Sequence, residues 1–306
     1  MTIEISTIAT SAVLLDMSIS AWSGRKRDKA TTAEVTLSKG AGSSKAASVI
    51  KNLMSDDAEL DALRAFAQAT RLWLQSVTLT WNDSGTRLLS SANMVNVLAE
   101  LDKRIESYDA LSAAFIVNLP LKVSAAAFKL GALFDRAEYP AAETLTRKFS
   151  MSYKIYPVPT SGDFRVDVQN DTAEFLKTHF EKLSQQHVAA AMREPWERMY
   201  QTLKHLSERV TASIDYAATG GDKVRQPKLF QSLLDNALEM VDGMEGINIT
   251  GDPQLTECAA RMRRVLSGVD IKSLRESDEL RKSVQSQVKD MLGAFDFGNV
   301  EGDSDE

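Results

Sequence analysis

Histidine and cysteine, the side chains that most often bind metals or act as nucleophiles, are few in this sequence. The three histidines are His179, His187 and His205, and Cys258 is the single cysteine. His179 and His187 stand eight residues apart on a predicted helix, which is too far for one metal ion, and no His-Glu-x-x-His motif occurs. One thiol cannot form an intrachain disulfide. The sequence therefore predicts no metal site, no cofactor and no nucleophilic triad.

Two short segments resemble catalytic motifs without completing them. Gly40–Lys45 lacks the Gly-Lys-Ser/Thr ending of a phosphate loop, and Ser48–Lys51 matches Ser-x-x-Lys without its companion motifs. Carboxylate pairs such as Asp56 and Asp57 are common on surfaces, and no spacing marks one as an acid/base couple. A non-enzymatic protein is the favoured interpretation.

A short basic cluster follows Trp22. Arg25, Lys26, Arg27 and Lys29 could bind phosphates while the indole of Trp22 stacks on a base, which would make the chain a binder of single-stranded nucleic acid. A solvated loop is the simpler interpretation. The formal net charge is −6, and five of the acids stand in the last eleven residues, so a global basic field is absent.

An apolar seam runs along the second of two long predicted helices. Its residues recur at spacings of three and four, as in packed helix pairs: Trp196, Met199, Leu203, Leu206 and Val210. Such a seam is either intramolecular core or an interface between subunits. Core is the more common role of such a seam, but the leading hypothesis about function takes it as an interface, which predicts a homo-oligomer or another protein partner.

The elements that would position these residues are mostly helical. Periodicity predicts long helices over about 91–130 and 172–218, forming an antiparallel pair, and a bundle of C-terminal helices. Pro120 and Pro195 are expected to kink or interrupt them. Strand patterns near 11–22, 76–89 and 151–168 predict a small antiparallel sheet, with a loop over 25–44 and a helix over 45–54. The fold class is mainly α, of the α+β type.

Three regions are expected along the chain. Residues 1–220 would form an α+β domain, 221–295 a helical region, and 296–306 a disordered acidic tail. No apolar run reaches about 18 residues and no secretory signal is recognised, so the expected location is the cytoplasm, with no membrane partner.

Three segments carry a resemblance to a known family. They are LLDMSISAWSGRK (14–26), LGALFDRAEYP (130–140) and PVPTSGDFRVDV (157–168). Together they resemble an uncharacterised family of bacteriophage and prophage proteins, a domain of unknown function. The resemblance implies no activity for any residue. It implies a phage or host protein partner in the host cytoplasm, with an AAA+ ATPase as one candidate.

Overall fold

The structure is a computed structural model that describes residues 5–43, 45–159, 170–218 and 229–293. It is 68% helical with a small antiparallel sheet of four strands, which confirms the mainly α, α+β class. The expected acidic tail over 296–306 lies outside the described residues.

The chain divides into two compact units that interleave along the sequence. Unit 1 comprises residues 1–15, 75–95 and 155–306, and unit 2 comprises 16–74 and 96–154. The expected boundary near residue 220 does not separate them, because the helices on both sides of it belong to unit 1. The unit boundaries fall inside long helices and strands, so no linker in the sequence marks them.

The sheet has the strand order β4-β5-β1-β6. Its strands are β1 (Ala12–Ser20), β4 (Leu79–Thr80), β5 (Arg87–Ser90) and β6 (Ser150–Pro157). β1 pairs antiparallel with β5 and places Ala12 opposite Ser90. β4 and β5 form a hairpin, in which Asn82 accepts a hydrogen bond from the Thr86 amide and Gly85 adopts φ +99°. The predicted strand at 164–168 lies outside the described residues.

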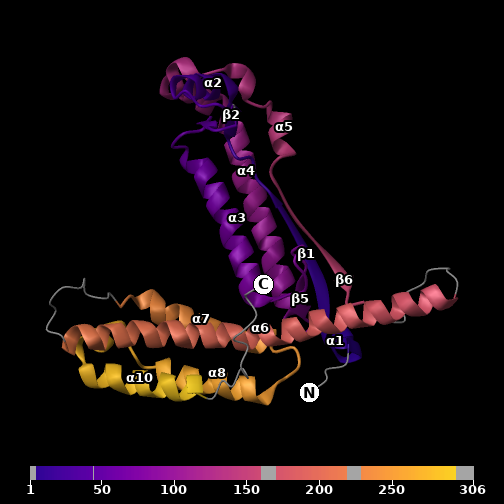
Figure 1. Cartoon of the computed structure of the whole chain (residues 1–306), viewed down its shortest axis with the longest axis vertical. Helices are drawn as coiled ribbons and strands as arrows, with labels where there is room; N and C mark the ends of the chain where they lie inside the picture. The colour runs from indigo at the N-terminus through magenta and orange to yellow at the C-terminus, as the bar shows by residue number, and fades with distance from the viewer. Residues whose placement is uncertain (1–4, 44, 160–169, 219–228, 294–306) are drawn as a thin grey trace. The chain divides into compact units, whose positions relative to one another are not determined.

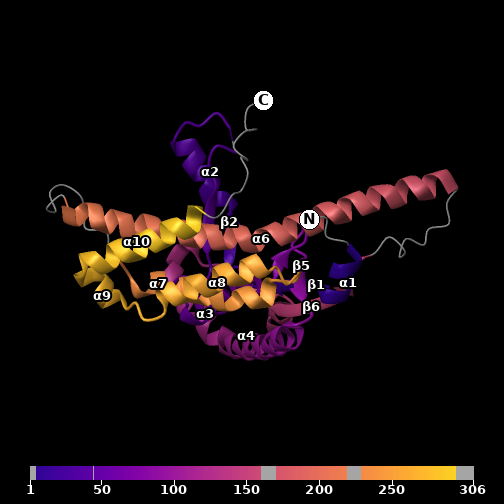
Figure 2. The same cartoon turned by 90° about the horizontal axis from the view of Figure 1, so that it is seen from below.

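The helices of unit 1 gather around one long helix. α6 (Asn170–Ala218) packs against α7 (Gln231–Ile247), α8 (Pro253–Leu266) and α10 (Asp278–Gly293), and both views show these helices along the C-terminal part of α6 (Figures 1 and 2). α1 (Ile5–Ser11) contacts α6 as well, and α9 (Ile271–Glu276) precedes α10. Asp252 and Asp270 cap α8 and α9 by accepting bonds from backbone amides of the first turn.

Unit 2 is built on two helices that lie side by side (Figure 1), α3 (Ala58–Val77) and most of α4 (Met94–Leu130). Its core is rich in aromatic rings, with Phe115 against Phe149 at 5.6 Å between ring centroids. Two buried tyrosines of this core donate hydrogen bonds to backbone carbonyls of other segments. Tyr108 donates to the Ser20 carbonyl at 2.7 Å, and Tyr139 donates to the Leu53 carbonyl at 2.8 Å. The short helix α5 (Ala142–Thr146) adds Leu145.

The segment over 25–54 differs from the expectation of a loop followed by a helix. It forms β2 (Arg25–Asp28), α2 (Lys29–Ser38) and β3 (Val49–Asn52), and β2 pairs antiparallel with β3. Asp28 ends the strand and caps α2 by accepting from the Thr31 amide at 3.0 Å. The predicted helix over 45–54 is wrong, because residues 49–52 of that segment pair with β2 and are therefore extended.

The two long helices are present with nearly the expected bounds, and both continue through their prolines. Gly131, with φ +53°, follows the last residue of α4, where a glycine favours the end of a helix. The helices were expected to pair with each other. Instead, one side of α4 is buried in the core of unit 2, and the apolar side of α6 is buried in the core of unit 1.

Candidate functional surfaces

The predicted interface seam on α6 lies inside unit 1. Met199, Leu203, Leu206 and Val210 are fully buried, and Trp196 packs against the same cluster. The covering side chains come from α7, α8 and α10, among them Leu234, Met262 and Val288. The indole nitrogen of Trp196 donates to Asp252 at 3.2 Å. The seam is therefore covered by the chain's own helices, and the interpretation as a surface between subunits is wrong for these five residues.

Trp22 and the basic cluster occupy different environments. Trp22 is only 7% exposed and its indole packs against Phe115, with centroids 6.3 Å apart, so it offers no face to a base. Lys26 lies 3.8 Å from the carboxylate of Glu138. Arg25, Arg27 and Lys29 are exposed, and Arg27 and Lys29 line an open hollow beside α2. Lys26 is exposed as well, with 51% of its side chain accessible, so the four cations of the predicted five-residue site remain at the surface and Trp22 does not.

A buried lysine anchors this hairpin. Lys51 on β3 lies 2.7 Å from Glu138 and 3.8 Å from Asp28, and it donates to the Leu133 carbonyl at 2.7 Å. Its side chain is 8% exposed, so the charge is shielded by these partners. We interpret the group as structural, since its contacts join β3 both to β2 and to residues 133–138.

α4 presents an apolar face that no described element of the chain covers. It consists of uncharged residues at helical spacing, Ala110, Ala113, Ala114, Val117, Leu121, Ser124, Ala125 and Phe128, and all of them are exposed. We call them the outward face of α4. Val117 is 78%, Leu121 76% and Phe128 91% exposed. At 1.5 Å per residue, the face is about 27 Å long. Apolar surface on this scale is typical of an interaction site.

Two cations near the outward face are held to its side by polar partners in unit 2, whereas the exposed Arg136 lines a hollow with Ser124 and Phe128 at the end of the face. Lys122 donates to Asp57 at 2.7 Å and lies 3.4 Å from Glu59. Lys129 donates to the Ser55 carbonyl at 2.9 Å. Asn118 donates to Glu59 at 3.2 Å. These contacts leave the middle of the outward face free of charge.

By length and composition alone, the helical stretch Met94–Leu133 could cross a membrane, and 28% of its most apolar part is buried within the chain. Core helices of soluble proteins meet the same criterion.

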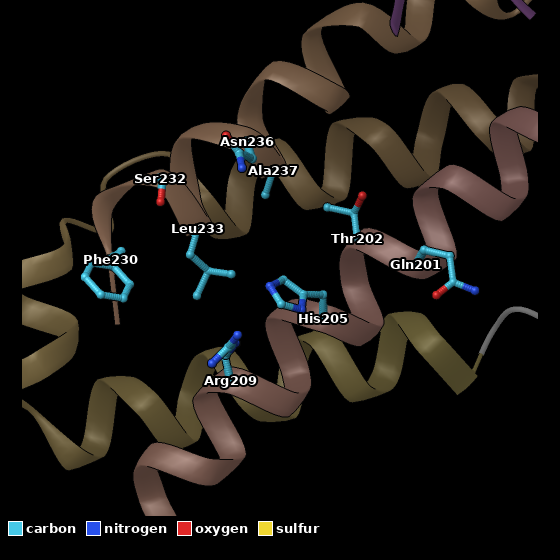
Figure 3. A pocket seen from close by; sticks show the side chains of 9 residues that line it. All are labelled: Gln201, Thr202, His205, Arg209, Phe230, Ser232, Leu233, Asn236 and Ala237. Atoms are coloured by element: carbon cyan, nitrogen blue, oxygen red, sulfur yellow. The ribbon is translucent and has the colours of Figure 1, made fainter. Parts of the chain in front are cut away.

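A pocket of about 400 Å³ opens between α6 and the start of α7 (Figure 3). α6 contributes Gln201, Thr202, His205 and Arg209 at helical spacing, so they share one side of the helix. The other wall holds Phe230, Ser232, Leu233, Asn236 and Ala237. None of these nine lining residues is acidic. The pocket combines a cation, an imidazole and amide groups with an aromatic ring.

The remaining chemistry-bearing side chains do not assemble into a site. Within the described ranges, no group of three or more His, Cys, Asp or Glu could hold a metal ion. His187 packs edge-on against Trp81, with centroids 5.2 Å apart. Cys258 is half-buried, and this burial raises the pKa of its thiol.

Sequence reasoning missed both the outward face and the pocket. A signal for the first was present, because residues 110–121 contain no charged side chain on any side of the helix. One helix in a small core buries only one side, so part of that stretch had to remain exposed. The pocket had no comparable signal, since α7 is separated from Arg209 by more than twenty residues.

Comparison with known proteins gives no relative. No family model, no curated protein and no solved structure matches this chain.

Proposed function

We propose that this chain is a non-enzymatic interaction protein that assembles with a second copy of itself through the outward face of α4. The observation that supports the proposal is the exposure of Val117, Leu121 and Phe128 on a face without charge. A partner that covers such a row removes apolar side chains from water, and this contributes about 25 cal/mol for each Å² buried.

The spacing of the face fits another helix. Ala110, Ala114, Val117, Leu121, Ser124 and Phe128 follow one another at intervals of 4, 3, 4, 3 and 4 residues, the repeat of a left-handed helix pair. Alanines at the first positions let two helix backbones approach closely. A second copy presents the same uncharged face, so a twofold arrangement brings like surface onto like surface without charge repulsion.

A membrane is the less suitable partner for this face. If α4 crossed a bilayer, Asn118, Lys122, Asp57 and Glu59 would enter the hydrocarbon together with the apolar face, because they contact one another beside its midpoint. Charged groups at that depth are costly. A helix lying on a membrane surface generally carries Lys and Arg opposite its apolar face, whereas the opposite side of α4 is core.

The test compares two exposed leucines. Leu121→Glu places a charge on the outward face, and Leu37→Glu places one on α2, where Leu37 is 81% exposed. We expect wild type and Leu37→Glu to exceed the 33.7 kDa mass of the monomer in multi-angle light scattering, and Leu121→Glu to be monomeric with an unchanged circular dichroism spectrum. Because assembly follows mass action, a wild type that is still monomeric at about 100 µM would overturn the proposal.

Vesicle sedimentation gives the other outcome. If wild type, but not Leu121→Glu, sediments with neutral lipid vesicles and remains monomeric without them, the face binds membrane and the assembly proposal fails. The AAA+ ATPase suggested by the resemblance is a separate proposal, to which the structure adds no support. It is tested by mixing purified ATPase with wild type and with Leu121→Glu and comparing the two complexes.

A further inference from the structure

We infer that the pocket between α6 and α7 binds a small organic oxyanion, with Arg209 and His205 facing its carboxylate or phosphate and Phe230 and Leu233 facing its apolar part. This inference concerns unit 1 alone and does not depend on assembly through α4. It rests on the residues that line the pocket and on the donors that they direct toward it.

The cationic wall is supplied by α6. Arg209 and His205 are one helical turn apart, and both side chains extend toward the gap in front of Leu233 (Figure 3). Within the residues that the structure describes, neither side chain has a hydrogen-bond or ion-pair partner. The guanidinium therefore retains its planar donor edge for a carboxylate or phosphate, to which it can donate two parallel bonds.

The facing wall adds donors and a helix terminus. α7 begins at Gln231 with Phe230 as its N-cap, and no side chain caps the first turn. The amides of Gln231 and Ser232 thus lack an intrahelical acceptor at the edge of the pocket. The helix dipole adds to the attraction of Arg209 for an anion. The nearest acid of α7, Asp235, accepts a hydrogen bond from the Gln231 side chain at 2.8 Å and does not line the pocket.

Phe230 and Leu233 provide an apolar surface for the part of the ligand that carries no charge. Phe230 is largely exposed at the pocket rim, and Leu233 stands between it and His205 (Figure 3). A flat ring or short alkyl group can pack against them while the anionic end reaches Arg209. A volume of about 400 Å³ is within the range of small-molecule sites. The ligand class is therefore a small aryl or alkyl carboxylate or monophosphate.

Phenyl phosphate and benzoate are suitable probes, titrated into full-length protein by calorimetry at about 0.15 M salt, where charges outside the pocket are screened. We expect saturable binding of at least one, and the preferred probe identifies the anionic group. Arg209→Gln should weaken binding by about tenfold or more, since it removes hydrogen bonds to a charged group. Phe230→Ala should weaken phenyl phosphate while leaving inorganic phosphate unchanged.

Lys204→Gln is the matched control, because Lys204 is an exposed cation on the same helix outside the pocket lining. It should change affinity by less than about twofold, since distant surface charges are screened. Absence of saturable binding of both probes up to about 10 mM, which corresponds to a very weak binding free energy, overturns the inference. So does equal weakening by Lys204→Gln and Arg209→Gln. Binding should persist in the Leu121→Glu protein, which separates this result from the assembly test.

Discussion

Lys122 Nζ lies 2.7 Å from Asp57 Oδ2, and this ion pair holds a cation near the middle of the outward face of α4 against the start of α3. Both side chains are less than 15% exposed, so the pair is shielded from water. Asp57 also accepts a hydrogen bond from the Leu60 amide at 2.9 Å, which stabilises the first turn of α3. The Asp57 carboxylate thus caps the first turn of α3 and also keeps the Lys122 ammonium off the outward face of α4.

Asp57→Asn removes the charge and retains an acceptor for the helix cap. We expect it to lower the free energy of unfolding by about 1–2 kcal/mol, because Lys122 keeps only Glu59 as a carboxylate partner. Asp61→Asn is the control, since Asp61 is 64% exposed and its pair with Arg64 contributes about 0.5 kcal/mol or less. Urea denaturation measures both. Equal losses in the two variants would contradict the role given to the Lys122 pair.

The seam on α6 gives a prediction about stability. Leu203 and Leu206 are fully buried, so Leu203→Ala should lower the free energy of unfolding by about 2–5 kcal/mol. Charging both residues to Glu should abolish the folded helices of unit 1, because neither carboxylate would find a partner there. Thermal denaturation followed by circular dichroism checks this result, with Lys204→Gln as the exposed control. A double variant that stays folded while its mass falls would restore the interface interpretation.

The elements that could be predicted are those whose pattern is local. The stripe of Leu60, Leu63, Ala67 and Leu74 on α3 and the turn residues around Gly85 are each complete within a short segment. β2 and β3 escaped prediction because Arg25 pairs with Asn52, far along the chain, and β2 is a run of charged residues with no alternation. Strands that pair over such a distance in the sequence need not show a recognisable pattern of apolar and polar residues in either strand alone.

Burial of the two long helices could not be assigned from their sequences. The α6 seam and the outward face of α4 show the same spacings of three and four, yet one is core and the other is exposed. Whether such a stripe is buried depends on whether other helices of the chain pack against it. α6 is covered by α7, α8 and α10, which follow it in the chain, whereas α4 has α3 against only one side. A periodic stripe predicts that something packs on it, but does not say which chain provides the contact.

Two capping aspartates predict an acid-sensitive component of stability. Hydrogen bonds from the Ser273 side chain and amide lower the pKa of Asp270, and the Thr31 amide lowers that of Asp28. A carboxylate with a depressed pKa in the folded state contributes stability above its unfolded pKa of about 3.9, and this contribution is lost as pH falls through the folded value.

The measurement is urea denaturation at pH 6 and at pH 2.5. Asp270→Asn keeps an acceptor for the cap but cannot titrate, so its stability should fall less between the two pH values than that of wild type. Asp61→Asn is the control, because the Asp61 carboxylate is 64% exposed and, among the described residues, accepts no helix-cap hydrogen bond. An identical fall in all three proteins would show that the Asp270 cap has no part in the acid response.

The basic cluster gives the last prediction. Trp22 packs on Phe115 in the core of unit 2, so Trp22→Ala should lower the free energy of unfolding by about 3–5 kcal/mol. Any affinity for single-stranded DNA would then come from the exposed cations Arg25, Lys26, Arg27 and Lys29. Fluorescence anisotropy with labelled oligothymidine at several salt concentrations measures it. Arg25→Ala with Arg27→Ala should reduce the slope of log affinity against log salt by about 1.4, because each substitution removes one cation that can neutralise a phosphate and each such contact contributes about 0.7 to the slope on a single strand. Trp22→Phe keeps a ring in the core and should leave both affinity and slope unchanged. If Trp22→Phe weakens binding while the protein stays folded, the indole does contact DNA and its core position is not maintained in the complex.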